Sequence, residues 1–424
     1  MKKLFAALIV VALVLTSVFA LVACQDNRSE MEKLIDEASK MSLEELEAAS
    51  KKEFEDNANA KFEAHSLTSG VKKALAKFIE KYDWLTEENA VYAAEKGADF
   101  QKTLNNAVES NGYAGDWVMI QDASFVYSLV NAGFLHSYVP SGDGFNIAKG
   151  DQKPIVGVTF NKIFYHNVAA GEDYLKNIWQ LTGKDGKEMK GIKKLSYQSP
   201  IGEDINMSFL IMLTSPDSVK TLKAAYKSYF GKDYDGKLED GKTKDGYENI
   251  GYKFVAEFIA NISTYHSSDT SEVKAMNTES HKDGIFFAGL AKIKDYVSET
   301  KTSDPDSEGY WKKVLRMSGY NYEVEGYNGF VYNMWTLIPE TAKLPYTACL
   351  FTRYLLSEEG YKAGFSEVGY YSANTLVESA DGSKLDHWKA TCLSEDPDYL
   401  NANYTVVTAF VKQQLTKAGQ SVDK

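Results

Sequence analysis

The chain has 424 residues, of which 44% are hydrophobic and 13% aromatic, and its formal net charge is −12. This length is enough for two lobes with separate cores, and the hydrophobic content is that of a globular protein. The acidic charge argues against nucleic acid as a partner, because nucleic-acid binding needs a basic surface.

The first residues have the pattern of an export signal. Two lysines precede an apolar run from Leu4 to Val22. A basic start, an apolar core and small residues before a cleavage site are typical of a signal peptide. The run is also long enough to span a bilayer, so an uncleaved anchor is the alternative. Its end resembles the bacterial lipobox and implies an acylated first mature residue, Cys24, in the sequence Leu21-Val22-Ala23-Cys24.

Acylation of Cys24 would anchor the protein to a membrane on its extracytoplasmic side. Diacylglycerol and an amide-linked chain supply several acyl chains, and a single chain binds membranes only marginally. The polar stretch from Gln25 to Glu30 would then act as a tether. We expect a signal peptide over 1–23 and a tether with an N-terminal helix over 24–57. The pattern Ser42-Leu43-Glu44-Glu45 predicts a capping box within that region.

Few residues are of the types that hold metals. Cys349 and Cys392 are the two cysteines after Cys24, and they could form one disulfide or remain two buried thiols. The sequence has no CxxC and no HExxH motif, and its six histidines are scattered. We therefore expect no metal site and no cofactor. Because the sequence has just three arginines, a site that grips anions through several of them is also disfavoured.

Short strands alternate with helices along most of the chain. Lys61–His65 and Trp117–Ile120 read as strands, and apolar residues at helical spacing follow each of them. Similar alternation returns in a second half, with strands near 192–197 and 284–289. This pattern predicts α/β lobes with parallel sheets, in which ligands bind beyond the carboxyl ends of the strands. Two longer β-like segments, 154–167 and 329–338, would cross between the lobes.

The C-terminal part resembles the closing signature of extracellular solute-binding proteins of ABC importers. In that family a crossing strand precedes a helix that ends in a Leu-Leu-Ser-x-Glu-Gly pattern, and a loop then leads to Pro-x-Asn. Here Tyr361 and Ala373 depart from the residues common in the family. The matching segments are Gly329–Trp335, Ile338–Ala342, Pro345–Ala348, Leu355–Tyr361 and Gly369–Asn374.

The resemblance implies a two-lobed, periplasmic-binding-protein-like α/β fold with two crossover segments and a central cleft. It places lobe 1 at 58–162 plus 336–374, lobe 2 at 163–335, and a C-terminal helical segment at 375–424. It also implies a small-molecule solute, an ABC permease as the membrane partner, and no enzymatic activity. Relatives of the iron-binding type use adjacent tyrosines in the second lobe, whereas the Tyr370-Tyr371 pair falls in the terminal loop, which disfavours iron.

Polar residues after predicted strands are the first candidates for solute contacts. Hydroxyl, carboxylate and backbone groups at helix starts would face the cleft, although each of these residues could simply cap its helix. The candidates of this kind are Ser66, Thr68, Ser69, Asp122, Ser124 and Ser199.

Aromatic residues in or beside the crossing segments are the second group. Their rings could stack on a sugar, a heterocycle or a cation, or could pack within the hinge. These residues are Tyr165, Tyr327, Tyr332 and Trp335.

Two other functions fit an exported lipoprotein, namely a surface hydrolase acting on glycans and an adhesin. The sequence lacks the GxSxG, P-loop and GxGxxG motifs, which disfavours several classes of enzyme. Its many carboxylates leave a glycosidase pair open. Solute binding is the function that the whole pattern favours.

Overall fold

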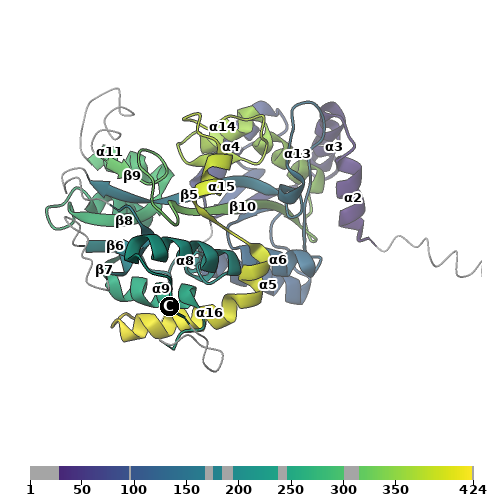
Figure 1. Ribbon diagram of the computed structural model, residues 1–424. Coiled ribbons are helices and arrows are strands. Elements are labelled where there is room, and N and C mark those ends of the chain that lie inside the picture. The colour runs from purple at the N-terminus through teal and green to yellow at the C-terminus, as the bar shows by residue number, and fades with distance from the viewer. Residues whose placement is uncertain are drawn as a thin grey trace, which may run out of the picture.

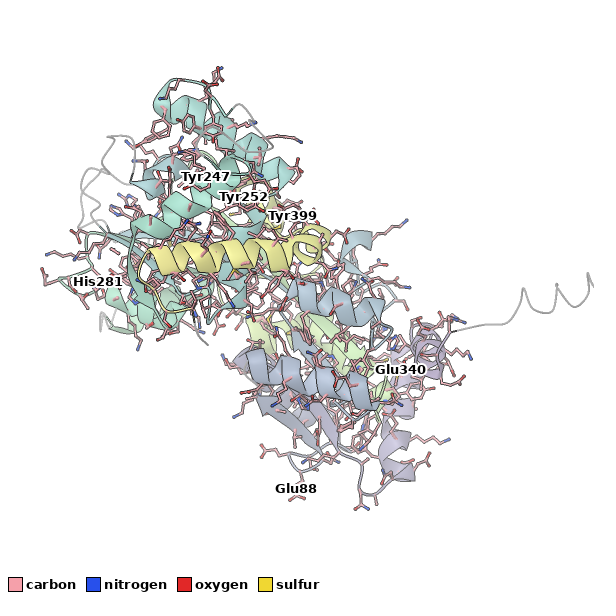
Figure 2. The ribbon with its side chains drawn as sticks, turned by 90° about the horizontal axis from the view of Figure 1, so that it is seen from below. Glu88, Tyr247, Tyr252, His281, Glu340 and Tyr399 are labelled. Atoms are coloured by element: carbon pink, nitrogen blue, oxygen red, sulfur yellow. The ribbon has the colours of Figure 1, made fainter. Side chains whose placement is uncertain are left out.

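The computed structural model describes residues 28–94, 97–167, 175–183, 194–236, 246–299 and 315–422. Two lobes lie on either side of a pair of long strands (Figure 1). The view from below shows the lobes as two masses, with Glu88 and Glu340 in one and Tyr247, Tyr252 and His281 in the other (Figure 2). Cys24 and the signal region lie outside the described residues.

Lobe 1 is built on three parallel strands, with β1 between β2 and β3. Its strands are β1 (Phe62–Ser66), β2 (Ala90–Ala94) and β3 (Trp117–Ile120), and its helices are α4 (Ser69–Lys81), α5 (Gly97–Ser110), α6 (Ala123–Asn131), α13 (Pro345–Leu356) and α14 (Glu358–Phe365). Phe62, Phe78 and Phe351 are fully buried between sheet and helices. Their rings meet edge to face, an arrangement that stabilises aromatic pairs.

Lobe 2 repeats the arrangement, with β6 between β7 and β8 and all three parallel. Its strands are β6 (Lys194–Gln198), β7 (Ile262–His266), β8 (Gly284–Gly289) and the short β9 (Leu315–Met317). Its helices are α7 (Asp204–Met212), α8 (Pro216–Phe230), α9 (Ile250–Asn261), α10 (Asp269–Ala275) and α11 (Ile293–Glu299), with the short 3-10 helices η3 (Ile178–Thr182) and η4 (Leu290–Lys292).

Two long antiparallel strands, β5 (Val156–Asn167) and β10 (Gly329–Pro339), join the lobes. The strand order is β2-β1-β3-β10-β5-β8-β6-β7, so β10 meets lobe 1 and β5 meets lobe 2. The expected boundaries at 162 and 336 fall inside these two strands. Nearly every residue of both strands is buried, which accounts for their apolar, β-branched and aromatic composition. The strand β11 (Tyr370–Ser372) also pairs with β5.

The end of the chain lies across the joint between the lobes. The segment contains α15 (Leu385–Thr391), β12 (Leu393–Ser394) and α16 (Pro397–Lys417), and β12 pairs with β10. Helix α16 contacts α6 of lobe 1 as well as α7 and α9 of lobe 2. Figure 2 shows α16 lying along the underside of the molecule, with Tyr399 near its start.

Two N-terminal helices, α2 (Glu30–Ala38) and α3 (Leu43–Asp56), pack on lobe 1 against α13. The capping box predicted at Ser42 is confirmed, since Ser42 and Glu45 bond reciprocally. The single predicted helical region is broken before Ser42, so that α2 and α3 each have their own cap. The two cysteines in the described chain, Cys349 and Cys392, are free and buried, which decides between the two alternatives left open above.

The start of α13 depends on a carboxylate from α3. Leu344, at the N-cap position of α13, gives no side-chain hydrogen bond. Instead, Glu53 accepts hydrogen bonds from the backbone N–H groups of Tyr346 and Thr347, each at 2.9 Å, and from the Thr347 hydroxyl at 2.7 Å. A carboxylate at a helix N-terminus satisfies unpaired N–H groups and complements the helix dipole. Glu53 therefore joins the N-terminal helices to lobe 1.

We predict that Glu53→Ala lowers the free energy of unfolding by about 1–3 kcal/mol, because partly buried N–H groups lose their acceptor. Equilibrium denaturation measures this difference. Glu55→Ala, an exposed position on the same helix, is the matched control and should change stability by less than about 0.5 kcal/mol. Equal effects of the two substitutions would contradict the capping role.

Candidate functional site

A cavity of about 520 Å³ lies between the lobes. It is lined by residues at the start of α4, just after β3, along β5 and β10, and in β11 on one side. Residues at the ends of β6 and β8 and at the starts of α7 and α10 line the other side. The parallel strands of both lobes thus direct their carboxyl ends at the same space, where α/β proteins bind ligands.

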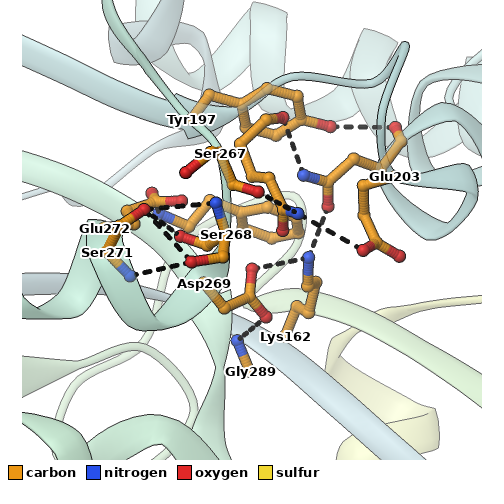
Figure 3. Close-up of polar contacts among 12 residues, drawn as sticks. Lys162, Tyr197, Glu203, Ser267, Ser268, Asp269, Ser271, Glu272 and Gly289 are labelled. Atoms are coloured by element: carbon orange, nitrogen blue, oxygen red, sulfur yellow. Dashed lines mark hydrogen bonds and ion pairs between the residues drawn. The ribbon is translucent and has the colours of Figure 1, made fainter. Parts of the chain in front are cut away.

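A buried lysine lies at the base of this cavity, on β5. The Lys162 ammonium is 2.9 Å from an Asp269 oxygen and donates to Asn206 Oδ1 at 2.7 Å (Figure 3). Its side chain is 2% exposed, so these partners replace water. Burial opposes the ammonium charge, but the carboxylates of Asp269 and Glu203 outweigh burial and raise the pKa of Lys162. Lys162 is therefore a charged group.

Asp269 connects the lysine to the backbone of lobe 2. Its second oxygen accepts a hydrogen bond from the Gly289 N–H at 3.1 Å, at the end of β8 (Figure 3). Ser268, directly before Asp269, caps α10 through the N–H of Ser271. These bonds fix the Asp269 carboxylate at the point where β8 and α10 meet.

A second carboxyl group, Glu272, lies one helical turn further along α10. It is fully buried and accepts from the Phe287 N–H at 2.7 Å. Burial, together with the neighbouring charge of Asp269, raises the pKa of Glu272 well above its usual range. This group lies behind the cavity wall and supports β8.

The two lobes touch across the cavity through polar side chains. Gln121, which follows β3 of lobe 1, donates to Glu203 Oε1 at 3.2 Å at the start of α7 in lobe 2. Gln198 donates to the other Glu203 oxygen at 3.3 Å. A second contact joins Lys294 of α11 to Glu367, just before β11, at 2.6 Å. Both contacts between lobes would break if the lobes moved apart.

Aromatic rings form the wall near the crossing strands. Phe160 of β5 and Tyr332 of β10 stack with centroids 5.4 Å apart and an angle of 17°. Tyr370 meets Phe160 edge to face at 4.7 Å. All three line the cavity, so the site offers ring surface as well as polar groups.

Three of the residues selected from the sequence line the cavity, namely Thr68, Ser69 and Tyr332. Thr68 is also the N-cap of α4, where its hydroxyl accepts from the Gly70 N–H at 3.3 Å. Both functions weighed for Thr68, namely capping and cleft contact, are therefore compatible with its position. Solute contact by these three residues stays a prediction.

The other polar candidates lie beside the cavity. Ser66 is fully buried and accepts from the Thr68 N–H, and Asp122 caps α6 and accepts from Gln101. Ser124 is in the first turn of α6, and Ser199 accepts from the Ile201 N–H. None of these four is among the residues that line the cavity.

The remaining aromatic candidates are packed within cores. Tyr165 is fully buried and donates its hydroxyl hydrogen to the Gly289 carbonyl at 3.0 Å. Tyr327 is buried beside Ser218, and Trp335 is 1% exposed with its ring edge to face with Tyr127. The three rings are thus packed inside the protein, which is the alternative considered for them above. None of the three lines the cavity.

The charged residues of the site were not among the residues predicted from the sequence to contact the solute. Lys162 lies in a mostly apolar strand and belongs to no recognisable motif. Glu203 and Asp269 lie at helix starts, where many surface carboxylates also occur. The one available signal was their place just after predicted strands or on a crossing segment. Within the described ranges, no three His, Cys, Asp or Glu side chains gather in a way that would hold a metal ion.

No protein-family model matches the chain, and no curated protein matches it. Solved structures do share its fold. A Bordetella parapertussis protein that carries the name extracellular solute-binding protein has a TM-score of 0.55 at 12% identity, covering 84% of this chain and 99% of that one.

Two further structures share the fold. MotA from A. tumefaciens B6, solved with glucopine, has a TM-score of 0.56 at 12% identity, covering 84% of this chain and 99% of that one. FutA from Trichodesmium, solved with iron and citrate, has a TM-score of 0.53 at 15% identity, covering 85% and 100%.

The chain therefore has the two-lobed fold of the periplasmic-binding-protein type, as the sequence predicted. In the part of the chain that is described, no helix combines the length and apolar composition needed to cross a bilayer.

We predict that Lys162→Met destabilises the protein by about 3–5 kcal/mol, because it leaves the Asp269 carboxylate without its cation in a shielded position. The double variant Lys162→Met/Asp269→Asn should recover part of the loss, which urea denaturation would measure. Lys220→Met, which removes the exposed ion pair with Asp217, is the control and should leave stability unchanged. A single variant as stable as the wild type would contradict the role of Lys162.

Proposed function

We propose that this chain is the extracytoplasmic solute-binding component of an ABC importer, which captures a small solute between its lobes and delivers it to a permease. The observation that carries the proposal is the cavity between the lobes, which the parallel strands of both lobes face. The neighbours with this fold include proteins solved with glucopine and with iron and citrate. They support small-solute binding as a class of function and leave the solute of this chain open.

The proposed mechanism is closure of two lobes around the solute. We assign 58–162 plus 336–374 to lobe 1 and 163–335 to lobe 2, with β5 and β10 as the connection. Bending at a few residues of such strands is enough for domain closure. The contacts of Gln121 with Glu203 and of Lys294 with Glu367 join the closed lobes. A bound solute would add further contacts to both lobes and favour the closed form.

The same proposal includes export and lipid anchoring through Cys24. Residues 1–23 would be removed as a signal peptide, and the acylated Cys24 would hold the protein at the membrane surface. The helices α2 and α3 pack on lobe 1, so the tether would reach the folded protein on that lobe. Lobe 1 would then be held near the membrane while lobe 2 moves. No chemical step is needed for this function.

A thermal-shift screen of the purified chain tests solute binding. We predict that one class among sugars, polyamines, vitamins, phosphonates and metals raises the melting temperature without being converted. A ligand that binds only the folded state adds about 2.7 kcal/mol at 100 times its Kd. Conversion of glycosides would instead indicate the hydrolase, and binding to a macromolecule with no small-solute shift would indicate the adhesin. Either result would contradict the proposal.

We also predict that Cys24→Ser abolishes lipid attachment, because serine lacks the thiol that carries diacylglycerol. Metabolic labelling with a fatty-acid analogue should mark the wild-type chain and leave the variant unlabelled. Cys349→Ser and Cys392→Ser are the controls, since both thiols are buried in the folded protein. Equal labelling of wild type and Cys24→Ser would overturn the anchor.

A further inference from the structure

The charged groups of the cavity differ in how well they are paired. Lys162 is paired with Asp269, and Lys294 with Glu367. Glu203 lines the same cavity and has no cation within ion-pair distance among the described residues. Among the described residues, its oxygens accept from neutral groups, namely the side-chain amides of Gln121 and Gln198 and the backbone N–H of Ile205. Glu203 is thus a carboxylate that has no ion-pair partner among the described residues.

The surroundings of Glu203 shield its carboxylate from part of the solvent. Burial raises the pKa of Glu203, and the Lys162 charge nearby offsets part of that effect. A carboxylate shielded from water loses part of its stabilisation by solvent. Hydrogen bonds from neutral amides restore less of that stabilisation than an ion pair does. A cation placed in the cavity beside Glu203 would supply the missing interaction.

At two helix starts and at the end of one strand around the cavity, backbone N–H groups that could bind an anion already donate to the chain's own side chains. Thr68 already accepts from the Gly70 N–H at the start of α4, and Ser268 accepts from the Ser271 N–H at the start of α10. Asp269 accepts from the Gly289 N–H at the end of β8. Free N–H groups at helix starts are what bind anions in folds of this kind. Lys292 also lines the cavity, but the lining as a whole carries three lysines and three carboxyl side chains and so has no excess of positive charge.

A second observation points to a ligand independently of the charges. Asn161 lines the cavity from β5 and is 1% exposed, yet neither its amide oxygen nor its amide nitrogen has a hydrogen-bond partner among the described residues. Buried amides are normally paired. A solute with N–H donors would satisfy the oxygen, and the stacked rings of Phe160 and Tyr332 offer faces that attract organic cations.

We propose that the solute carries an organic ammonium group, which pairs with the Glu203 carboxylate between the lobes. This inference rests on the proposed function of the cavity as the solute site. It assigns Glu203 as the residue that selects the solute by charge. The contact of Gln121 in lobe 1 with Glu203 in lobe 2 fits this assignment. Closure of the lobes would enclose the ion pair between Glu203 and the solute and exclude water from it.

A matched panel of solutes tests the charge of the ligand. The ammonium set is 1,4-diaminobutane, spermidine, lysine and arginine, the neutral set is 1,4-butanediol, glucose and maltose, and succinate, phosphate and ferric citrate complete the panel. We expect rises in melting temperature for members of the ammonium set alone. Glu203→Gln keeps the shape of the side chain and one acceptor oxygen but removes its charge. It should weaken the best amine by about 10- to 100-fold in calorimetry.

Glu358→Gln, at an exposed position on α14, is the control and should bind as the wild type does. Stabilisation by neutral or anionic members but by no amine, or equal amine affinity in Glu203→Gln and wild type, would overturn the ammonium assignment while leaving solute binding intact. A panel widened to vitamins and phosphonates in which no compound stabilises the chain would overturn the proposed function itself.

The pH dependence of binding gives a readout on the wild-type chain, should Glu203→Gln fold poorly. Binding of an ammonium group needs ionised Glu203, so affinity should be full above the raised folded-state pKa of this carboxyl. It should fall as the pH is lowered through that value. The other titratable groups around Glu203 are Lys162, Tyr197, Asp204, Asp269 and Tyr332. An affinity that rises on acidification would contradict the assignment.

Discussion

Strands β5 and β10 run side by side from one lobe to the other, and their pairing joins the sheets of the two lobes. The register joins Gly329 to Ile163 at one end and Trp335 to Val156 at the other, with an irregularity after Met334. Because β10 also pairs with β3 and β5 with β8, each lobe's parallel sheet is fixed to this pair. The cleft therefore exists because two sheets share a common antiparallel centre. Its width depends on how that centre bends.

A buried charge lies on this antiparallel centre. Lys162 lies on β5 between Asn161 and Ile163, and its ammonium is held by Asp269 and Asn206 from lobe 2. Replacing a buried ion pair by apolar residues is often neutral or stabilising, so stability alone does not account for it. The pair aligns polar groups along one side of the cavity, with Glu203 beside them. A polar cavity of this kind serves binding at some cost in stability.

Local sequence patterns were enough to predict the helices and strands named below. The residues that meet at the cavity are instead determined by contacts between distant parts of the chain. Strand β8 has the bounds Gly284–Gly289 that its apolar run predicted, and Ser42 caps α3 as its capping box required. Such features depend on residues close together in the chain. In contrast, Gln121 and Glu203 are 82 positions apart and Lys162 and Asn206 are 44 apart, so no local pattern marks them.

The aromatic residues of the crossing strands show the same limit. Tyr165, Trp335 and Tyr332 all belong to long β segments, and the sequence does not state which face of each strand borders the cavity. Pairing with β8 and packing around β9 buried Tyr165 in a core, whereas Tyr332 stacked on Phe160 at the cavity wall. Side-chain direction alternates along a strand, so the fold must be known before a ring can be assigned to the cleft.

The most direct measurement of the central claim is equilibrium dialysis of the purified chain against the low-mass fraction of a rich growth medium, read by mass spectrometry. Heat-denatured protein provides the background. The account predicts that one compound or a small related group is retained, approaching one molecule per chain, and is recovered chemically unchanged. Retention of no compound above the background, or recovery of cleaved products, would contradict it.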